Sequence, residues 1–141
     1  MAVLVIDASA TLPWCFADEA TAATNAVLVG LRTGDDAIVP AHWPLEVANA
    51  LMIAARRKRI SPEDAHQFLL GLEFLPIHVE ATTKNLVRAG VFPMAEQFGL
   101  TVYDAAYLEL AMREGISLMT LDHDLRKAAV AAGVPLVGPQ P

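Results

Sequence analysis

The sequence predicts an α/β fold in which a parallel sheet of four to five strands has helices on both faces. Short apolar runs rich in β-branched residues alternate along the 141-residue chain with longer segments of helical composition. The first run, Ala2–Ile6, is wholly apolar and is followed directly by Asp7. Such a run is typical of a strand in a parallel sheet, which is buried on both faces. No repeat or linker interrupts the pattern, so we expect one domain over residues 1–141.

The composition limits the chemistry that the chain can perform. Apolar residues make up 55% of it, which is enough for a large core. The single cysteine, Cys15, excludes an intramolecular disulfide and a zinc site built from several cysteines, and it favours a cytoplasmic location. The apolar start is too short for a signal peptide or a membrane span, so we expect no membrane association. A formal charge of −6 argues against a protein that coats nucleic acid with a basic face, but not against an enzyme that contacts a few phosphates.

Glycine and proline residues separate the elements that follow the first strand. In the N-terminal half we expect a short connection or helical turn at 9–16, a helix at 18–32, a strand at 37–39, a helix from about 41 to 59, and a helix that has Ser61 as N-cap and ends near 73. In the C-terminal half we expect an edge strand at 75–79, a mostly helical segment at 81–99 that is interrupted around 90–93, a helix at 103–114, a strand at 116–120, a helix at 124–132, a last short strand at 135–137 and a loose tail at 139–141.

Three aspartates occupy the ends of strands or the starts of helices. Asp7 follows the first strand, Asp122 follows the strand at 116–120, and Asp104 lies just before an apolar helix. Because the carboxyl ends of parallel strands share one edge of a sheet, the first two are expected to be neighbours. Each aspartate also has a purely structural interpretation as a helix cap, and for Asp104 the preceding Thr101 gives the pattern of a capping box.

The fourth acid, Glu46, belongs to a helix that is apolar on nearly every side over residues 41–55 and is therefore expected to be buried. Its polar exceptions, His42, Glu46 and Asn49, are spaced i, i+4 and i+7 and form one stripe. The stripe either faces solvent or meets a polar partner or a metal.

A cluster of these carboxylates would be repulsive without cations. Oxygen ligands with few histidines select Mg²⁺ or Mn²⁺, which together with substrate phosphate form a phosphoryl-transfer site. The chain has neither a glycine-rich dinucleotide fingerprint nor a Walker A sequence, so a nucleotide-binding fold is unsupported. Cys15 and the four scattered histidines show no local catalytic or metal-binding signature.

Four segments of the sequence resemble the acidic motifs of PIN-domain ribonucleases. They are Val5–Ser9, Pro44–Leu51, Leu100–Tyr107 and Leu118–Asp122. Their spacing and the chain length are most similar to the VapC-type toxins of toxin–antitoxin pairs. The resemblance covers essentially the whole chain and implies a three-layer α/β/α sandwich with a parallel sheet, in agreement with the alternation of strands and helices.

The same resemblance implies the roles of the site residues. Asp7, Glu46, Asp104 and Asp122 form the acidic site, in which Asp7 and Asp104 bind Mg²⁺ (or Mn²⁺) most directly and Asp122 is a more variable ligand that Asp124 can share or replace. Smaller polar residues support the site, namely Ser9, Asn49 and Thr120. The implied reaction is metal-assisted hydrolysis of an RNA phosphodiester, in which Glu46 or Asp122 completes the coordination or orients water.

The implied partners are an RNA substrate, an antitoxin that covers the site and a second copy of the chain in a homodimer. We expect the RNA to be held by basic side chains, namely Arg56–Arg59, Arg113, Arg126 and Lys127. Alternative hypotheses are a PIN-like module that binds RNA or an antitoxin with little catalysis, and a metal-dependent phosphatase or a nuclease that acts on DNA.

Overall fold

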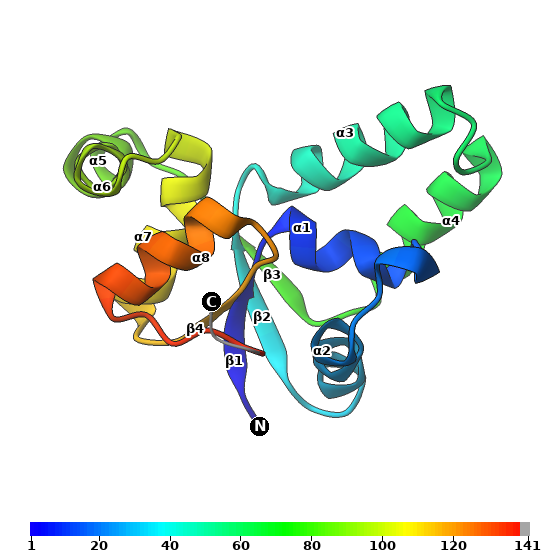
Figure 1. Ribbon diagram of the computed structural model, residues 1–141, viewed down its shortest axis with the longest axis horizontal. Helices are drawn as coiled ribbons and strands as arrows, with labels where there is room; N and C mark the ends of the chain where they lie inside the picture. Colours follow the sequence, from blue (N-terminus) through cyan, green and yellow to red (C-terminus); the bar gives the residue numbers. More distant parts are fainter. Residues whose placement is uncertain (139–141) are drawn as a thin grey trace.

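A parallel sheet of four strands in the order β3-β2-β1-β4 forms the centre of the computed structural model, which describes residues 1–138 (Figure 1). The strands are β1 (Val3–Ile6), β2 (Asp36–Pro40), β3 (Ile77–Glu80) and β4 (Ser117–Met119). In the registers, Val5 pairs with Ile38 on one side and with Leu118 on the other. The central position of β1 explains why its sequence is a continuous apolar run: Val5 and Ile6 are completely buried.

Helices cover both faces of this sheet and give the predicted three-layer sandwich (Figure 1). One face carries α1 (Ala8–Thr11), α2 (Ala22–Arg32), α3 (Trp43–Arg56) and α4 (Pro62–Leu72), with short 3-10 turns at Leu12–Trp14 and Ala17–Glu19. The other face carries α5 (Lys84–Leu86), a π-helical turn at Val87–Val91, α6 (Phe92–Phe98), α7 (Val102–Glu114) and α8 (His123–Ala132).

The C-terminal segment differs in part from the prediction. Residues 135–137 were expected to form a strand, but they make a single parallel bridge between Leu136 and Leu118. Two backbone hydrogen bonds hold the bridge, from Leu118 N to the Pro135 carbonyl and from Val137 N to the Leu118 carbonyl. Pro135 has no N–H to extend the ladder, which explains why a full strand does not form. The tail expected at 139–141 lies outside the described residues.

Helix α3 corrects the expectation that the whole helix at 41–55 is buried. Its core side consists of residues at helical spacing, namely Trp43, Val47, Leu51 and Ala54. The opposite side is apolar but open, because Leu45 is 74% exposed and Met52 is 52% exposed. Only one side of α3 is buried against the rest of residues 1–138. The apolar composition of the helix therefore predicted more burial than the structure has.

The interruption expected around 90–93 takes the form of a π-helical turn. Gly90 in this turn lies against α7, and a Cβ atom there would be 3.4 Å from Cγ of Glu109. Pro93 follows at the start of α6, directly after this turn, and its missing N–H interrupts the hydrogen-bond ladder there. The close approach covers Glu109, which is only 6% exposed.

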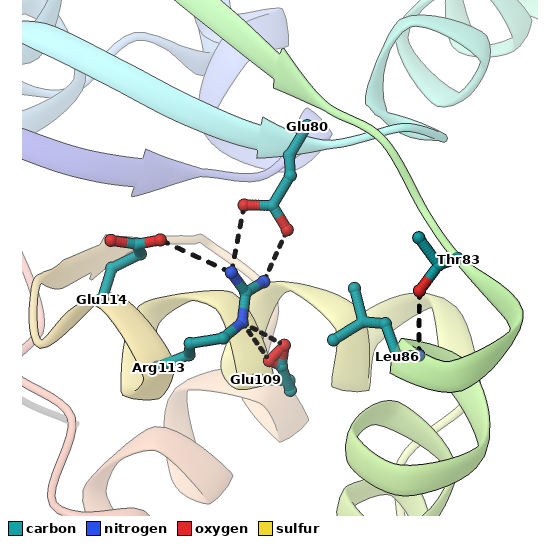
Figure 2. A network of polar contacts seen from close by, with 6 residues as sticks. All are labelled: Glu80, Thr83, Leu86, Glu109, Arg113 and Glu114. Carbon is teal, nitrogen blue, oxygen red and sulfur yellow. Dashed lines mark hydrogen bonds and ion pairs between the residues drawn. The ribbon is translucent and has the colours of Figure 1, made fainter.

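Arg113 connects the edge strand β3 to α7 through three carboxylates (Figure 2). Its Nε donates to both oxygens of Glu109, at 2.9 and 3.0 Å, and its two terminal nitrogens donate to Glu80 at the end of β3. Glu114 adds a longer contact of 3.4 Å. Hydrogen bonding to Glu80 is the largest cause of a pKa for Arg113 above the usual arginine value. The guanidinium is therefore occupied by neighbours on its own chain.

No helix of residues 1–138 has the length and apolar character that crossing a membrane requires.

Candidate active site

The four predicted acids come from four elements that end or begin at the carboxyl edge of the sheet. Asp7 directly follows β1, and Asp122 lies three residues beyond the end of β4. Glu46 is in the first turn of α3, soon after β2, and Asp104 is in the first turn of α7. The acids influence one another electrostatically, since Asp104 interacts with the charges of Asp7, Glu46 and Asp122.

Asp7 is the most buried of the four, with 5% of its surface exposed. Its Oδ1 accepts hydrogen bonds from the Ser9 hydroxyl at 2.7 Å and from Ala10 N at 3.0 Å, and its Oδ2 accepts one from Thr120 at 2.5 Å. Burial raises the pKa of Asp7 from 3.8 to about 6; the three hydrogen bonds oppose this rise, and the charge of Asp104 adds to it. A carboxylate with this pKa is held ionised at neutral pH at a cost that a nearby cation would reduce.

Two hydroxyl groups connect Asp7 to the loop between β4 and α8. Leu121 N donates to the Ser9 hydroxyl at 2.8 Å, and that hydroxyl donates to Asp7. In the same way Asp122 N donates to Thr120 at 3.0 Å, and Thr120 donates to the other Asp7 oxygen. Both oxygens of one carboxylate are thus fixed relative to the backbone that carries Asp122, and the predicted supporting positions of Ser9 and Thr120 are explained.

Asp104 is half-buried, and the pKa of its carboxyl is raised. Burial is the largest cause, followed by the charges of Asp122 and Glu46, whereas His42 and Thr101 lower it. Asp122 is thus the charged neighbour with the strongest effect on Asp104.

The capping interpretation is confirmed for Asp7 and Asp122. Asp7 caps α1, and Asp122 caps α8 by accepting from Leu125 N at 2.8 Å. Thr101 caps α7 by accepting from Asp104 N at 3.1 Å, but among residues 1–138 the Asp104 carboxylate does not accept from Thr101 N, so the predicted capping box is only half formed. Two of the four acids, Asp7 and Asp122, are therefore also helix caps, because these short loops bring several helix N-termini to one edge, where their dipoles favour negative charge.

Glu46 has two neighbours, His42 and Tyr107, and sequence reasoning connected only His42 with it. The Tyr107 hydroxyl donates to Glu46 Oε1 at 2.5 Å, and His42 Nε2 lies 3.5 Å from the same oxygen. The polar stripe predicted that His42 lies on the same side of the helix as Glu46, whereas Tyr107 was noted only as part of the third motif. The one sequence signal for them is spacing, because His42 precedes Glu46 by four residues and Tyr107 follows Asp104 by three.

The donor set fits a magnesium-type ion, although the ligands are not fully gathered. Among residues 1–138 no three acidic, histidine or cysteine side chains converge closely enough to form a finished metal site. Mg²⁺ is commonly bound by only one or two carboxylates and keeps several waters. Asp7 uses three of the roughly four acceptor positions of a carboxylate, so one remains for a cation.

Comparison with known proteins gives consistent results. The family model that describes the PIN domain matches residues 4–131. A curated relative, ribonuclease VapC3 of Pyrobaculum aerophilum, is 39% identical over 94 residues, which are 64% of this chain and 69% of the relative.

Solved structures share the fold. PAE2754 from Pyrobaculum aerophilum has a TM-score of 0.73 at 24% identity, over 96% of this chain and 84% of that one. VapC20 of Mycobacterium tuberculosis, described as a toxin that cleaves the sarcin–ricin loop, has a TM-score of 0.64 at 16% identity, over 96% and 99% of the two chains. The family model covers most of the sequence, and the alignment with the curated relative extends over 64% of the chain. The chain therefore belongs to the PIN domain family and is of the VapC type.

Proposed function

We propose that this chain is a metal-dependent endoribonuclease that acts as the toxin of a type II toxin–antitoxin pair. The observation that carries the proposal is the placement of Asp7, Glu46, Asp104 and Asp122 at one edge of the sheet, where Asp104 interacts with the charges of the other three and burial raises the pKa of Asp7 to about 6. A buried cluster of mutually repulsive carboxylates lowers the free energy of unfolding. A divalent cation bound there would offset the repulsion and bind a phosphate substrate. The relationship to a curated VapC ribonuclease supports RNA as the substrate.

In the proposed site Asp7 and Asp104 would hold Mg²⁺ or Mn²⁺, with Asp122 as a further ligand. Bound there, the cation would lower the pKa of the attacking water and offset charge on the phosphate. The chain itself fixes the direction of Asp7 through Ser9 and Thr120. Glu46 has one oxygen occupied by Tyr107, and within the described part of the chain its other oxygen has no hydrogen bond, so it is available to orient water.

The structure narrows which basic residues can bind the RNA backbone. Arg59 forms ion pairs with Asp18 and Glu19 and lies 4.0 Å over the ring of Phe16, and Arg113 is held by its three carboxylates. Both are therefore poor candidates for phosphate contacts. We assign that contact first to the exposed cations at the end of α3, namely Arg56, Arg57 and Lys58, and keep Arg126 and Lys127 of α8 as further candidates.

The proposed activity is tested with the purified full chain on single-stranded RNA and on DNA of the same sequence. We expect RNA cleavage with Mg²⁺ or Mn²⁺, none with EDTA, and none by Asp7→Asn or Asp104→Asn variants that remain folded. Full metal-dependent activity in both variants would contradict the proposed site. Equal cleavage of DNA would contradict RNA specificity, and no cleavage with any divalent ion would favour a binding module.

The partner assignment has its own test. Solved structures with this fold include a toxin–antitoxin complex from Klebsiella pneumoniae, with a TM-score of 0.60 at 14% identity. We expect a small DNA-binding protein to be encoded beside this chain, and its co-expression should suppress RNA cleavage. Light scattering of the chain alone and of the complex tests the expected homodimer.

A further inference from the structure

Helices α3 and α7 are joined beside the acidic cluster by two hydrogen bonds that run in opposite directions. The Tyr107 hydroxyl on α7 donates to Glu46 Oε1 on α3 at 2.5 Å. Nε2 of His42, the N-cap residue of α3, lies 3.0 Å from the backbone carbonyl of Tyr103 on α7. A carbonyl only accepts, so Nε2 carries the proton and donates. Each helix therefore gives one donor and receives one.

These two hydrogen bonds link helices that otherwise rest on different parts of the molecule. Helix α3 packs mainly on α4 and α1, whereas α7 packs mainly on α6, α8 and the strands β1 and β2 (Figure 1). Glu46 is on the first helix and Asp104 is on the second. Without a direct link, the distance between these two acids would depend on two independent packing arrangements.

The rings that provide the link are themselves fixed by packing. Tyr107 is 1% exposed, and the ring of His42 meets it edge-on with the centroids 5.0 Å apart. His42 also contacts the ring of Tyr103, at 5.5 Å. Burial, followed by the bond to Glu46, raises the pKa of Tyr107 above its usual value, so the phenol stays protonated and remains a donor. Packing thus restrains both rings, and the phenol keeps the proton that it donates to Glu46.

We propose that Tyr107 and His42 form a clamp that sets the position of the Glu46 carboxylate relative to Asp104, and that Tyr107 is a positioning residue for phosphodiester cleavage. The expected effect of Tyr107 on the cleavage rate rests on the proposed function, whereas the position that the clamp gives to the Glu46 carboxylate does not. The clamp leaves Glu46 with one free oxygen in a defined place, which a group that orients water requires.

The test is the Tyr107→Phe variant, which removes one oxygen atom and keeps the buried ring. Its matched control is Tyr103→Phe, the same change one turn earlier on α7 at a side chain that is 60% exposed. For Tyr107→Phe we expect kcat to fall roughly 10- to 100-fold with KM within about 2-fold of wild type. We expect the control to retain wild-type values.

A double-mutant cycle separates positioning from a general structural effect. If Tyr107 acts through Glu46, then Tyr107→Phe costs nothing more in a Glu46→Gln background. A loss of the same size in both backgrounds would overturn the clamp, and so would wild-type kcat in Tyr107→Phe.

A readout without substrate keeps the clamp testable if the wild-type chain cleaves no RNA. In protein labelled with ¹³C at the glutamate carboxyl carbons, Tyr107→Phe should shift and broaden the Glu46 resonance, while Tyr103→Phe should leave it in place. An unchanged Glu46 resonance in Tyr107→Phe would overturn the clamp whatever the activity. If the wild-type chain cleaves no RNA but Tyr107→Phe still shifts the Glu46 resonance, the proposed function is wrong and the clamp stands.

Discussion

The Thr120 hydroxyl donates a 2.5 Å hydrogen bond to Asp7 Oδ2, so that a residue after the edge strand β4 fixes the carboxylate that follows the central strand β1. The same hydroxyl accepts from Asp122 N at 3.0 Å. Thr120 is completely buried, and within residues 1–138 no buried side-chain nitrogen or oxygen lacks a hydrogen bond. The first acid and the fourth acid are thus connected through one oxygen atom.

A Thr120→Val substitution should therefore destabilise the protein by about 1–3 kcal/mol, because it leaves two polar groups without their partner while the size of the side chain is nearly unchanged. Urea denaturation at pH 7 measures the loss. Thr120→Ser, which keeps the hydroxyl, is the control and should lose clearly less. Equal losses in the two variants would mean that the methyl group matters and the hydrogen bonds do not.

Asp7 should make the metal-free protein less stable as the pH rises from about 4 to about 6. Its pKa is 3.8 in the unfolded chain and about 6 when folded, so the folded state binds the proton more tightly and loses this advantage over that window. The full effect is on the order of 3 kcal/mol. Thermal denaturation between pH 4 and pH 8 should show that the decline is smaller in Asp7→Asn than in wild type.

Two further results would bear on this prediction. At pH 7 without metal, Asp7→Asn should be at least as stable as wild type although it is inactive. Addition of Mn²⁺ should raise the midpoint of wild type and leave that of Asp7→Asn nearly unchanged. A large loss of stability in metal-free Asp7→Asn would show that Asp7 serves mainly as the cap of α1.

Local chemistry explains how much of the fold could be predicted from the sequence. The burial of β1 follows from its uninterrupted apolar residues, and the start of α4 follows from Ser61, whose hydroxyl accepts from Asp64 N at 3.0 Å. Gly115 ends α7 at φ 66°, a conformation that favours glycine. Each of these signals involves residues within a few positions of one another.

The features that could not be predicted depend on contacts between distant positions. Leu45 on the apolar side of α3 is exposed because little of the described chain packs against it. The composition of a helix does not show which of its sides will be covered. The hydrogen bond between Tyr107 and Glu46 joins residues 61 positions apart. The four acids stood out by their positions in the sequence, but the rule that parallel strands end at one edge predicted only that Asp7 and Asp122 are neighbours. The places of Glu46 and Asp104 depend on how α3 and α7 pack.

Replacement of Arg113 by methionine should destabilise the protein by on the order of 3 kcal/mol, because Glu109 would remain as a buried carboxylate without a partner. The double variant Arg113→Met and Glu109→Met should recover most of this loss, since both charges are then absent. Glu114→Gln is the control at the exposed end of the network and should change stability by less than about 0.5 kcal/mol. Guanidinium denaturation of the four proteins gives these differences.

The same variants test whether Arg113 contacts RNA. If its guanidinium serves only the network with Glu80 and Glu109, the double variant should cleave RNA at the wild-type rate per folded molecule. A reduced rate with a weaker salt dependence in that variant would return Arg113 to the set of phosphate contacts.

The exposed cations at the end of α3 should control the salt dependence of RNA cleavage. For single-stranded RNA each lost phosphate contact reduces the slope of log(kcat/KM) against log salt by about 0.7, so the triple substitution of Arg56, Arg57 and Lys58 by alanine should reduce it by about 2. Single charge reversals provide a matched comparison. Arg57→Glu should weaken cleavage at low salt, whereas Arg32→Glu, at the opposite edge of the sheet before β2, should not. Identical salt slopes in all three variants and in wild type would mean that the RNA follows a different path from the acidic cluster.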